Sequence, residues 1–391
     1  MKDVILFYKR LIKPGGAERL LLKEYAYFKK MGYTVRIATY EYGNNTSFFQ
    51  SIDNNDLRII KRNSTVLRII HLALFLRKNS KSIFVCNSGY IDFYLASVIS
   101  RVDYFLHLHQ PSFMSFNEVD KYSLLMRKDF NQLIGSNYGA KAFVKIKESL
   151  TILDLFLINI RAFISIKGIR KAKNVFVLSD FAVREKKIMY GIEAINISGA
   201  LDESIFLYYP KKINKYNNYK NKLLTIARLD KNKRIDELIF AFSIFLKKNS
   251  DSILIIGGTG TEYQNLSDLI IQLGVEKNVK LVGFIPDEKI YDYYSWADLF
   301  ISIDWADFRI TSYEAMAMGT KVLLSDETDV DSDLITTGYY YLTEPNRYIV
   351  ASNIEHALAN LDIMSKNELF KILNNYTWSK YFLKMEELVN A

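Results

Sequence analysis

TSYEAMAMG, residues Thr311–Gly319, directly follows WADFRI, residues Trp305–Ile310, and these two stretches decide the fold class. A strand-like apolar run, 297–303, leads into them, and good helix formers then continue to a glycine of the kind that ends helices. Strand, short loop and helix in this order predict a helix N-terminus at the carboxyl end of a parallel strand. Backbone N–H groups and the helix dipole favour an anion at that edge of a sheet, so the sequence predicts a phosphate site there.

Strand-like and helix-like stretches alternate on both sides of this segment, in the βαβα rhythm that is typical of doubly wound parallel sheets. A polar stretch at 208–222 interrupts the rhythm and is expected to be a linker. It separates an N-terminal domain, 1–207, from a C-terminal domain, 223–373, and a last helix, 374–391, is expected to return to the first domain. The expected strands lie at 4–8, 34–40, 82–86, 103–109, 175–180, 222–227, 252–258, 279–284, 298–303 and 321–325. The expected helices lie at 17–31, 67–77, 90–100, 235–246, 264–273, 287–294 and 311–318, and the tail from 353 is helical in pattern.

Length and composition favour an ordinary two-domain protein. The chain of 391 residues is longer than a domain with a single hydrophobic core usually is, and 49% of its residues are hydrophobic. Cys86 is the only cysteine, which excludes an internal disulfide and fits a reducing compartment. No secretory signal and no apolar run long enough for a spanning helix is visible. We therefore expect a cytoplasmic chain, and the basic first half of the sequence is the reason to expect peripheral association with the inner face of the plasma membrane.

The net charge of +9 conceals an asymmetry. Residues 1–200 hold 31 of the 52 Lys and Arg but only 16 of the 43 Asp and Glu, which gives +15 there and −6 in the remainder. A basic half indicates an anionic membrane or a phosphorylated acceptor, and no motif supports nucleic acid. Solvated lysines in a Lys-rich protein explain the same excess.

The segment 141–173 combines apolar residues at helical spacing with lysines and arginines at both ends. Such a helix could lie on an anionic membrane surface. A crossover helix that packs on the sheet gives the same pattern, and periodicity does not separate the two.

Two clusters in the first half could meet a ligand. Gly15 and Gly16 follow the first strand, where glycines let the backbone approach a ligand at a helix start, although a plain tight turn has the same sequence. His107 and His109 alternate on the fourth strand and face one side. We expect no metal there, because no third ligand stands at suitable spacing. A structural role for His107 stays open.

Two further clusters lie in the second half. Arg228 and Lys233 straddle a turn into a helix, where they could hold a diphosphate or simply be solvated. The backbone N–H groups of residues 308–311, namely Phe308, Arg309, Ile310 and Thr311, are expected to point at the phosphate. Glu314 could grip a ribose diol, or it could complete an S/T-x-x-E capping box with Thr311.

Taken together, these residues resemble the family 4 retaining glycosyltransferases of the GT-B fold. The likeness runs through PGGAE at 14–18, 175–192, GALDESIF at 199–206, IARLDKNKRIDELIFAF at 226–242 and YEAMAMGTKVLLSD at 313–326. The resemblance implies two Rossmann-like domains that face each other across a cleft, with the acceptor on the first and a nucleotide-sugar donor on the second.

The resemblance also assigns roles. Arg228 and Lys233 look like the family's basic pair on the donor diphosphate, and Glu314 looks like the second acid of its E-x7-E motif. Gly16, beside Gly15, would approach the donor phosphate, and His109 would meet the donor sugar. Gly258 and Phe284 fall in stretches that the resemblance places at the donor. The family usually needs no metal or other cofactor.

One departure stands out. The first acid of E-x7-E should fall at Ala306, and the glycines that normally follow are replaced. Asp307 or Asp304 could supply the carboxylate, and Arg309 could add a phosphate contact. The sugar that the enzyme would recognise stays open for the same reason.

The sequence thus predicts a glycosyltransferase that moves a hexose from a nucleotide diphosphate sugar to a surface glycan, such as lipopolysaccharide or capsule, or to a lipid-linked precursor. Two alternatives stay open. One is a nucleotide-sugar hydrolase or epimerase on the same fold, and the other is a silent donor-binding partner subunit, which the alanine at 306 motivates.

Overall fold

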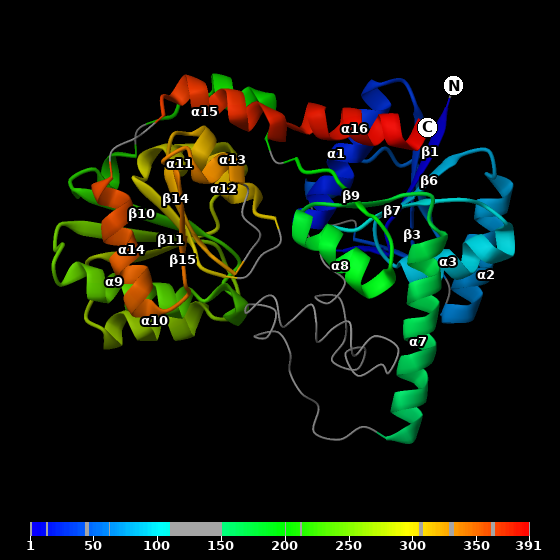
Figure 1. The fold of residues 1–391 in the computed structure, drawn as a ribbon, viewed down its shortest axis with the longest axis horizontal. Helices are drawn as coiled ribbons and strands as arrows, with labels where there is room; N and C mark the ends of the chain where they lie inside the picture. The colour runs from blue at the N-terminus through cyan, green and yellow to red at the C-terminus, as the bar shows by residue number, and fades with distance from the viewer. Residues whose placement is uncertain are drawn as a thin grey trace. The chain divides into compact units, whose positions relative to one another are not determined.

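The computed structural model describes residues 2–12, 15–43, 47–61, 63–109, 151–199, 201–211, 213–304, 308–327, 332–360 and 364–390. The chain divides into two compact units: unit 1 comprises 1–198 and 381–391, and unit 2 comprises 199–380. Each unit is built on one large parallel β-sheet with helices packed against it (Figure 1). The predicted class, two α/β domains with parallel sheets, is confirmed.

The sheet of unit 1 has the strand order β5-β3-β1-β6-β7-β8-β9, and every neighbouring pair is parallel. The strands are β1 Asp3–Phe7, β3 Thr34–Thr39, β5 Leu57–Ile59, β6 Ile83–Cys86, β7 Phe105–His107, β8 Val175–Val177 and β9 Ile195–Asn196. The two-residue strands β2 Arg10–Leu11 and β4 Glu41–Tyr42 pair separately. The order reverses between β1 and β6, so the loops after these two strands diverge.

The helices of unit 1 connect these strands as parallel crossovers. They are α1 Gly16–Lys30, α2 Thr65–Lys78, α3 Tyr90–Ser100, α7 Ile152–Lys171 and α8 Asp180–Tyr190, with a 3-10 turn at Ser47–Phe49. The last helix, α16 Trp378–Asn390, belongs to unit 1 from Tyr381 onward. Its Phe382 stacks on Tyr27, and its Glu386 accepts hydrogen bonds from Tyr27 and Tyr33.

The sheet of unit 2 has the order β12-β11-β10-β13-β14-β15, again all parallel. The strands are β10 Asn221–Ile226, β11 Ser252–Gly257, β12 Val279–Gly283, β13 Leu299–Ser302, β14 Lys321–Ser325 and β15 Tyr340–Thr343. Numbered along the unit, this is the order 3-2-1-4-5-6 of dinucleotide-binding folds. The sequence pattern does not predict the edge strand β15.

Helices cover both faces of this sheet, because side chains alternate along each strand. Leu223, Leu254 and Ile301 pack under one set of helices, whereas Leu224, Ile255 and Phe300 pack under the other. The first set is α9 Ile235–Leu246, α10 Tyr263–Gln272 and α14 Arg347–Ala359. The second is α11 Asp287–Trp296, α12 Ile310–Ala317, α13 Ser332–Ile335 and α15 Lys366–Leu373. Short 3-10 turns lie at Glu203–Leu207, Asn214–Tyr216, Lys231–Lys233 and Asn374–Tyr376.

Candidate functional site

The loops after β10 and β13 lie where the strand order of unit 2 reverses. β10 pairs with β11 on one side and with β13 on the other, so the chain leaves these neighbouring strands in opposite directions. Open α/β sheets bind ligands in the crevice at such a point. Arg228 and Lys233 follow β10, and Arg309 follows β13. The fold therefore brings cations that are distant in sequence to one edge of the sheet.

Asp304 holds two of these cations. Its Oδ2 lies 2.5 Å from Lys233 Nζ, and its Oδ1 lies 3.6 Å from Arg309 Nε. The Ser302 hydroxyl donates to Oδ1 at 2.6 Å, and Asp304 is only 3% exposed. Burial alone would raise the pKa of Asp304, but Arg309 and Lys233 outweigh it and hold this pKa below its usual value. The ionised carboxylate therefore fixes both cations at the sheet edge.

This geometry bears on the carboxylate that the sequence lacks at Ala306. Ala306 and the substitute Asp307 lie outside the described residues. The other substitute, Asp304, is directed at Lys233 and Arg309, so in this structure it holds protein cations. Arg309 also donates from Nη2 to the Asp304 carbonyl. It is 9% exposed, so it is tied into the base of the loop.

Arg228 differs from Lys233 because its guanidinium is largely exposed. Its side chain is 76% exposed and pairs with Asp230 at 3.0 Å. An exposed pair of this kind is weak and leaves the guanidinium able to reorient toward a ligand. The backbone that carries Arg228 is well anchored, since the Leu229 amide donates to the Thr259 carbonyl at 2.9 Å and the Glu262 amide donates to the Leu229 carbonyl at 2.8 Å.

Gly258 anchors the same loop. Its φ of +130° suits glycine, and an added Cβ would lie 1.8 Å from the Ala227 carbonyl oxygen. Only glycine allows the end of β11 to lie this close to the residue before Arg228. The role of Gly258 in the structure is thus to position the Arg228 loop, and its predicted contact with a donor stays a prediction.

Helix α12 begins two residues earlier than a capping box at Thr311 requires. Its N-cap is Arg309, none of the described side chains caps it, and Thr311 is already helical. The capping-box interpretation of Thr311 and Glu314 is therefore wrong. First-turn N–H groups of a helix have no intrahelical acceptor, and here they belong to residues that include Ile310 and Thr311. The dipole of α12 favours an anion at this end.

Glu314 lies on the buried side of α12. It is 7% exposed, and the hydroxyl of the fully buried Tyr294 donates to its Oε2 at 3.2 Å. Phe308 packs on Tyr313 with ring centroids 5.1 Å apart. Phe284, after β12, is 70% exposed. The structure thus orders Glu314 and Phe308, while it leaves Phe284 at the surface.

A second ion pair at this edge escapes the sequence analysis. Arg234 takes a left-handed conformation, φ 51°, just before α9. Its Nη1 donates to Glu327 Oε2 at 2.6 Å and to the Ile303 carbonyl at 3.1 Å. Glu327 is 6% exposed, so this pair ties together the loops after β10, β13 and β14. The run of basic residues in KNKR, 231–234, is the sequence feature that could have drawn attention to Arg234.

In unit 1, Gly15 and Gly16 start α1. Gly15 is the N-cap in an extended conformation. An added Cβ on Gly16 would meet none of the described atoms within 4 Å, so space is left beside it. Glu18, in the first turn, accepts a hydrogen bond from the Tyr8 hydroxyl at 2.8 Å.

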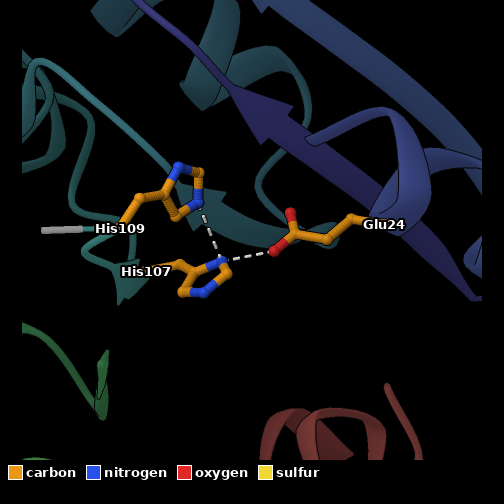
Figure 2. A group of neighbouring side chains, drawn as sticks. All are labelled: Glu24, His107 and His109. Carbon is orange, nitrogen blue, oxygen red and sulfur yellow. Dashed lines mark hydrogen bonds and ion pairs between the residues drawn. The ribbon is translucent and has the colours of Figure 1, made fainter. Parts of the chain in front are cut away.

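His107 and His109 converge with an acid that the sequence analysis missed (Figure 2). His109 Nε2 lies 3.2 Å from His107 Nδ1, and Glu24 Oε1, from α1, lies beside the same Nδ1. The amide oxygen of Asn87, just after β6, is 2.9 Å from both histidine nitrogens. Tyr381 Oη lies 2.6 Å from His107 Nε2. The sequence predicts no metal at the two histidines because it shows no third ligand near them. In the structure Glu24 lies in the position of such a third ligand, so this reason no longer holds.

Burial dominates the electrostatics of this cluster. It raises the pKa of Glu24 to about 7, against the opposing effects of His109 and Asn87. Burial also lowers the pKa of His107 and of His109 to about 3 each. Both imidazoles are therefore neutral near pH 7 and offer nitrogen lone pairs.

Comparison with known proteins fits the site in unit 2. Residues 210–377 match the family model of glycosyl transferases group 1. The second unit is a group 1 glycosyl transferase domain. The site at the reversal of its strand order, with Arg228 and Lys233, lies inside the matched residues.

The curated relatives match shorter stretches than this domain. Mannosylfructose-phosphate synthase of Agrobacterium fabrum is 33% identical over 112 residues, which cover 26% of this chain and 25% of that protein. Alpha-monoglucosyldiacylglycerol synthase of Streptococcus pneumoniae is 29% identical over 102 residues, 26% of this chain and 23% of the relative. The chain thus spans about a quarter of the length of the curated relatives it matches.

Solved structures share the fold of the whole chain. HepE of Anabaena in complex with UDP has a TM-score of 0.74 and 16% identity, and the match covers 100% of both chains. HepE has also been solved with UDP-glucose. At this identity the likeness shows a common fold, in which the group 1 domain is the second of two units.

Within the part of the chain that the structure describes, no helix is both long and apolar enough to span a membrane.

Proposed function

We propose that this chain is a retaining glycosyltransferase that transfers a hexose from a nucleotide diphosphate sugar to a surface glycan or its lipid-linked precursor. One observation carries the proposal: where the strand order of a group 1 domain reverses, Arg228 and Lys233 follow β10, and Asp304 joins Lys233 to Arg309, the N-cap of α12. Both cations and the helix end suit a diphosphate, because they supply positive charge and N–H donors at one place.

In the proposed mechanism these groups stabilise the diphosphate as it leaves. Negative charge develops on the leaving phosphate, and preorganised donors lower the barrier because they need no rearrangement during the reaction. Asp304 orders Lys233 before the donor arrives, and an ammonium with three N–H donors can keep that bond and still contact a phosphate. The cations replace a metal in this role, so the proposed transfer needs none.

The remaining donor contacts follow the family resemblance. Glu314 would accept from the ribose hydroxyls, and its hydrogen bond from Tyr294 would keep the carboxylate in place. Gly258, Phe284 and Phe308 would line the donor in unit 2, and Asp307 would supply the acid that Ala306 lacks. Gly15, Gly16 and His109 are the proposed contacts from unit 1.

A uridine diphosphate donor is the first to test, because HepE was solved with UDP and with UDP-glucose. Purified protein should be heated with UDP, GDP, ADP, dTDP and CMP, alone and as sugar conjugates. A ligand at a hundredfold excess over its dissociation constant stabilises the protein by about 2.7 kcal/mol, so one nucleotide series should raise the unfolding temperature.

The Glu314→Gln variant should lose most of that rise, because the amide is a poorer acceptor for the ribose hydroxyls. Glu355→Gln is the matched control, since Glu355 is exposed on α14 of the same unit and should keep the full rise. Equal rises in both variants would remove Glu314 from the donor site.

We also propose that unit 1 associates with an anionic membrane through α7. The helix has two apolar sides. Ile158, Ala162 and Ile169 are buried against the unit, whereas the opposite side exposes six large hydrophobic residues: Ile152, Leu153, Phe156, Leu157, Ile160 and Phe163. Crossover packing therefore explains only one side. The exposed side, together with nearby lysines and arginines, is typical of a helix that lies on a membrane. Residues 141–150, which belong to the predicted segment, lie outside the described part.

The two helices next to α7 in the packing order also expose apolar residues. α7 packs against α3, and α3 packs against α2. α3 exposes Val98 and Ile99, and α2 exposes Val66 and Leu74. A lipid acceptor fits such a surface, and one curated relative is named as a glycolipid synthase.

Vesicle binding tests this proposal. The double variant Phe156→Ser/Phe163→Ser should bind phosphatidylglycerol-containing vesicles at least about tenfold more weakly, because each buried aromatic contributes about 1.5–3 kcal/mol. Tyr348→Ser, at an exposed position of α14 in unit 2, is the control and should bind as the unaltered chain does. The proposal would be contradicted if the double variant bound as strongly as the control variant. It would also be contradicted if the unaltered chain bound vesicles of phosphatidylcholine alone as strongly as vesicles that contain phosphatidylglycerol.

A further inference from the structure

The cluster of Glu24, His107 and His109 brings three potential metal-ligand atoms close together. Two imidazole nitrogens and one carboxylate oxygen come from two elements, α1 and the end of β7 (Figure 2). All three atoms lie within 4.8 Å of one another, and His107 Nδ1 to His109 Nε2 is 3.2 Å. The Asn87 amide oxygen adds a fourth atom at 2.9 Å from each of these nitrogens.

The charge balance of this cluster leaves room for a cation. Glu24 is fully buried, and the described groups that favour its ionised form are His109 and Asn87, with no lysine or arginine among them. A buried carboxylate costs several kcal/mol unless it is paired, coordinates a metal or takes up a proton. A divalent ion would thus compensate the one buried charge.

The surroundings resemble the second shell of a metal site. A ligating histidine usually bonds through its other ring nitrogen, and a ligating carboxylate is itself hydrogen-bonded. His107 Nε2 lies 2.6 Å from the Tyr381 hydroxyl. When Nδ1 binds an ion, Nε2 carries the proton, and the hydroxyl oxygen can accept a hydrogen bond from it. The Asn87 amide donates to Glu24 Oε2 at 3.0 Å and leaves Oε1 on the side of the histidines.

We propose that unit 1 binds one divalent transition-metal ion, with Zn²⁺ as the probe, through His107 Nδ1, His109 Nε2 and a Glu24 carboxylate oxygen. Two imidazoles and a carboxylate form a ligand set that zinc accepts, with Asn87 or solvent in the fourth position. The ion would fasten α1 to the end of β7, and through His107 it would reach Tyr381 on α16. The ion would occupy Nε2 of His109, which leaves Nδ1 of the same ring for the proposed contact with the donor sugar.

Direct metal binding tests the proposal without reference to transfer activity. The purified full chain, stripped with a chelator, should take up one Zn²⁺ per chain in competition with a chromophoric chelator. Its unfolding temperature should rise with Zn²⁺ and not with Mg²⁺, because Mg²⁺ prefers oxygen ligands. Glu24→Gln and His109→Asn should each weaken binding at least about tenfold.

The chain supplies its own controls. It has four histidines, and the two outside the cluster are His71 and His356. His71→Asn and His356→Asn should leave zinc binding and the zinc-dependent rise in unfolding temperature unchanged. Two different variants are made at the site so that the test does not depend on one of them folding. The unfolding temperature without metal shows whether each variant folds. Loss of zinc binding in His71→Asn or His356→Asn, or no stoichiometric uptake by the unaltered chain, would overturn the proposal and leave a proton as the partner of Glu24.

Discussion

Replacement of Arg228 by alanine is expected to lower kcat/KM for hexose transfer by about 100- to 1,000-fold, the usual effect of removing one group that stabilises a leaving anion. The loss should appear mainly in kcat, because the interaction strengthens as charge develops on the diphosphate. Stability should change by about 0.5 kcal/mol or less, since the side chain is 76% exposed and its pair with Asp230 lies at the surface. Activity and stability therefore separate at this residue.

Lys231→Ala is the matched control for Arg228→Ala. Lys231 lies three residues further along the same loop, its side chain is 74% exposed, and it pairs with an acid of α9, Asp236. It should retain nearly full turnover. Arg228→Lys should keep part of the activity, because an ammonium supplies the charge but not the two-pronged hydrogen bonds. Full turnover by Arg228→Ala would remove this residue from the donor site.

Replacement of Asp304 by alanine should destabilise unit 2 by about 3–5 kcal/mol, the usual cost of removing one partner from a buried ion pair. The carboxylate is 3% exposed and pairs with Lys233 and Arg309, and both cations would lose that partner. Chemical denaturation followed by tryptophan fluorescence would measure the change. Glu193→Ala, which breaks an exposed pair with Lys187, is the control and should cause no measurable loss.

The Asp304 effect should also depend on pH. Because the folded protein holds the pKa of Asp304 below its usual 3.8, the ionised carboxylate stabilises the fold above that value. The contribution is lost as pH falls through the folded pKa. The difference in stability between the unaltered chain and Asp304→Ala should therefore be constant near pH 7 and shrink below about pH 4. A difference that grows on acidification would contradict the assignment.

The fold could be predicted from local patterns because its strands are short, apolar and separated by helices of ordinary length. KLLTIA at 222–227 corresponds to β10, and KVLLS at 321–325 is β14. The strand β15 was not predicted, although tyrosine favours strands, because it is only four residues long, lies at the edge of the sheet and follows a polar loop. Nothing within 339–343 fixes a partner strand, so the pairing with β14 is decided by tertiary packing.

The site could be predicted only where its residues are neighbours in sequence. Arg228 and Lys233 share one loop, so their meeting at a helix start is local information. The partner of Lys233 is Asp304, 71 residues away, and the partner of Arg234 is Glu327, 93 residues away. Such pairs depend on which strand ends the fold brings together, and no spacing rule reports them.

Glu24 illustrates the same limit. An acid within a helix of mixed polarity is usually solvated, so the sequence gives no reason to place it beside His107. The capping-box motif at Thr311 failed for a different reason. The pattern of residues fits, but Arg309 takes the extended N-cap conformation and the helix starts before Thr311. A motif of two residues shows that a capping box is possible, and the backbone conformation determines whether it forms.

The most direct test of the account is acceptor-dependent turnover of UDP-glucose and related donors by the unaltered chain on membranes or a lipid acceptor, with NMR of the product anomer. We predict that nucleoside diphosphate is released only when acceptor is present and that the new glycosidic bond keeps the anomeric configuration of the donor. Release without acceptor would identify a hydrolase. A donor that binds and stabilises the protein yet never turns over would contradict the account and favour the silent partner subunit that the alanine at 306 motivates.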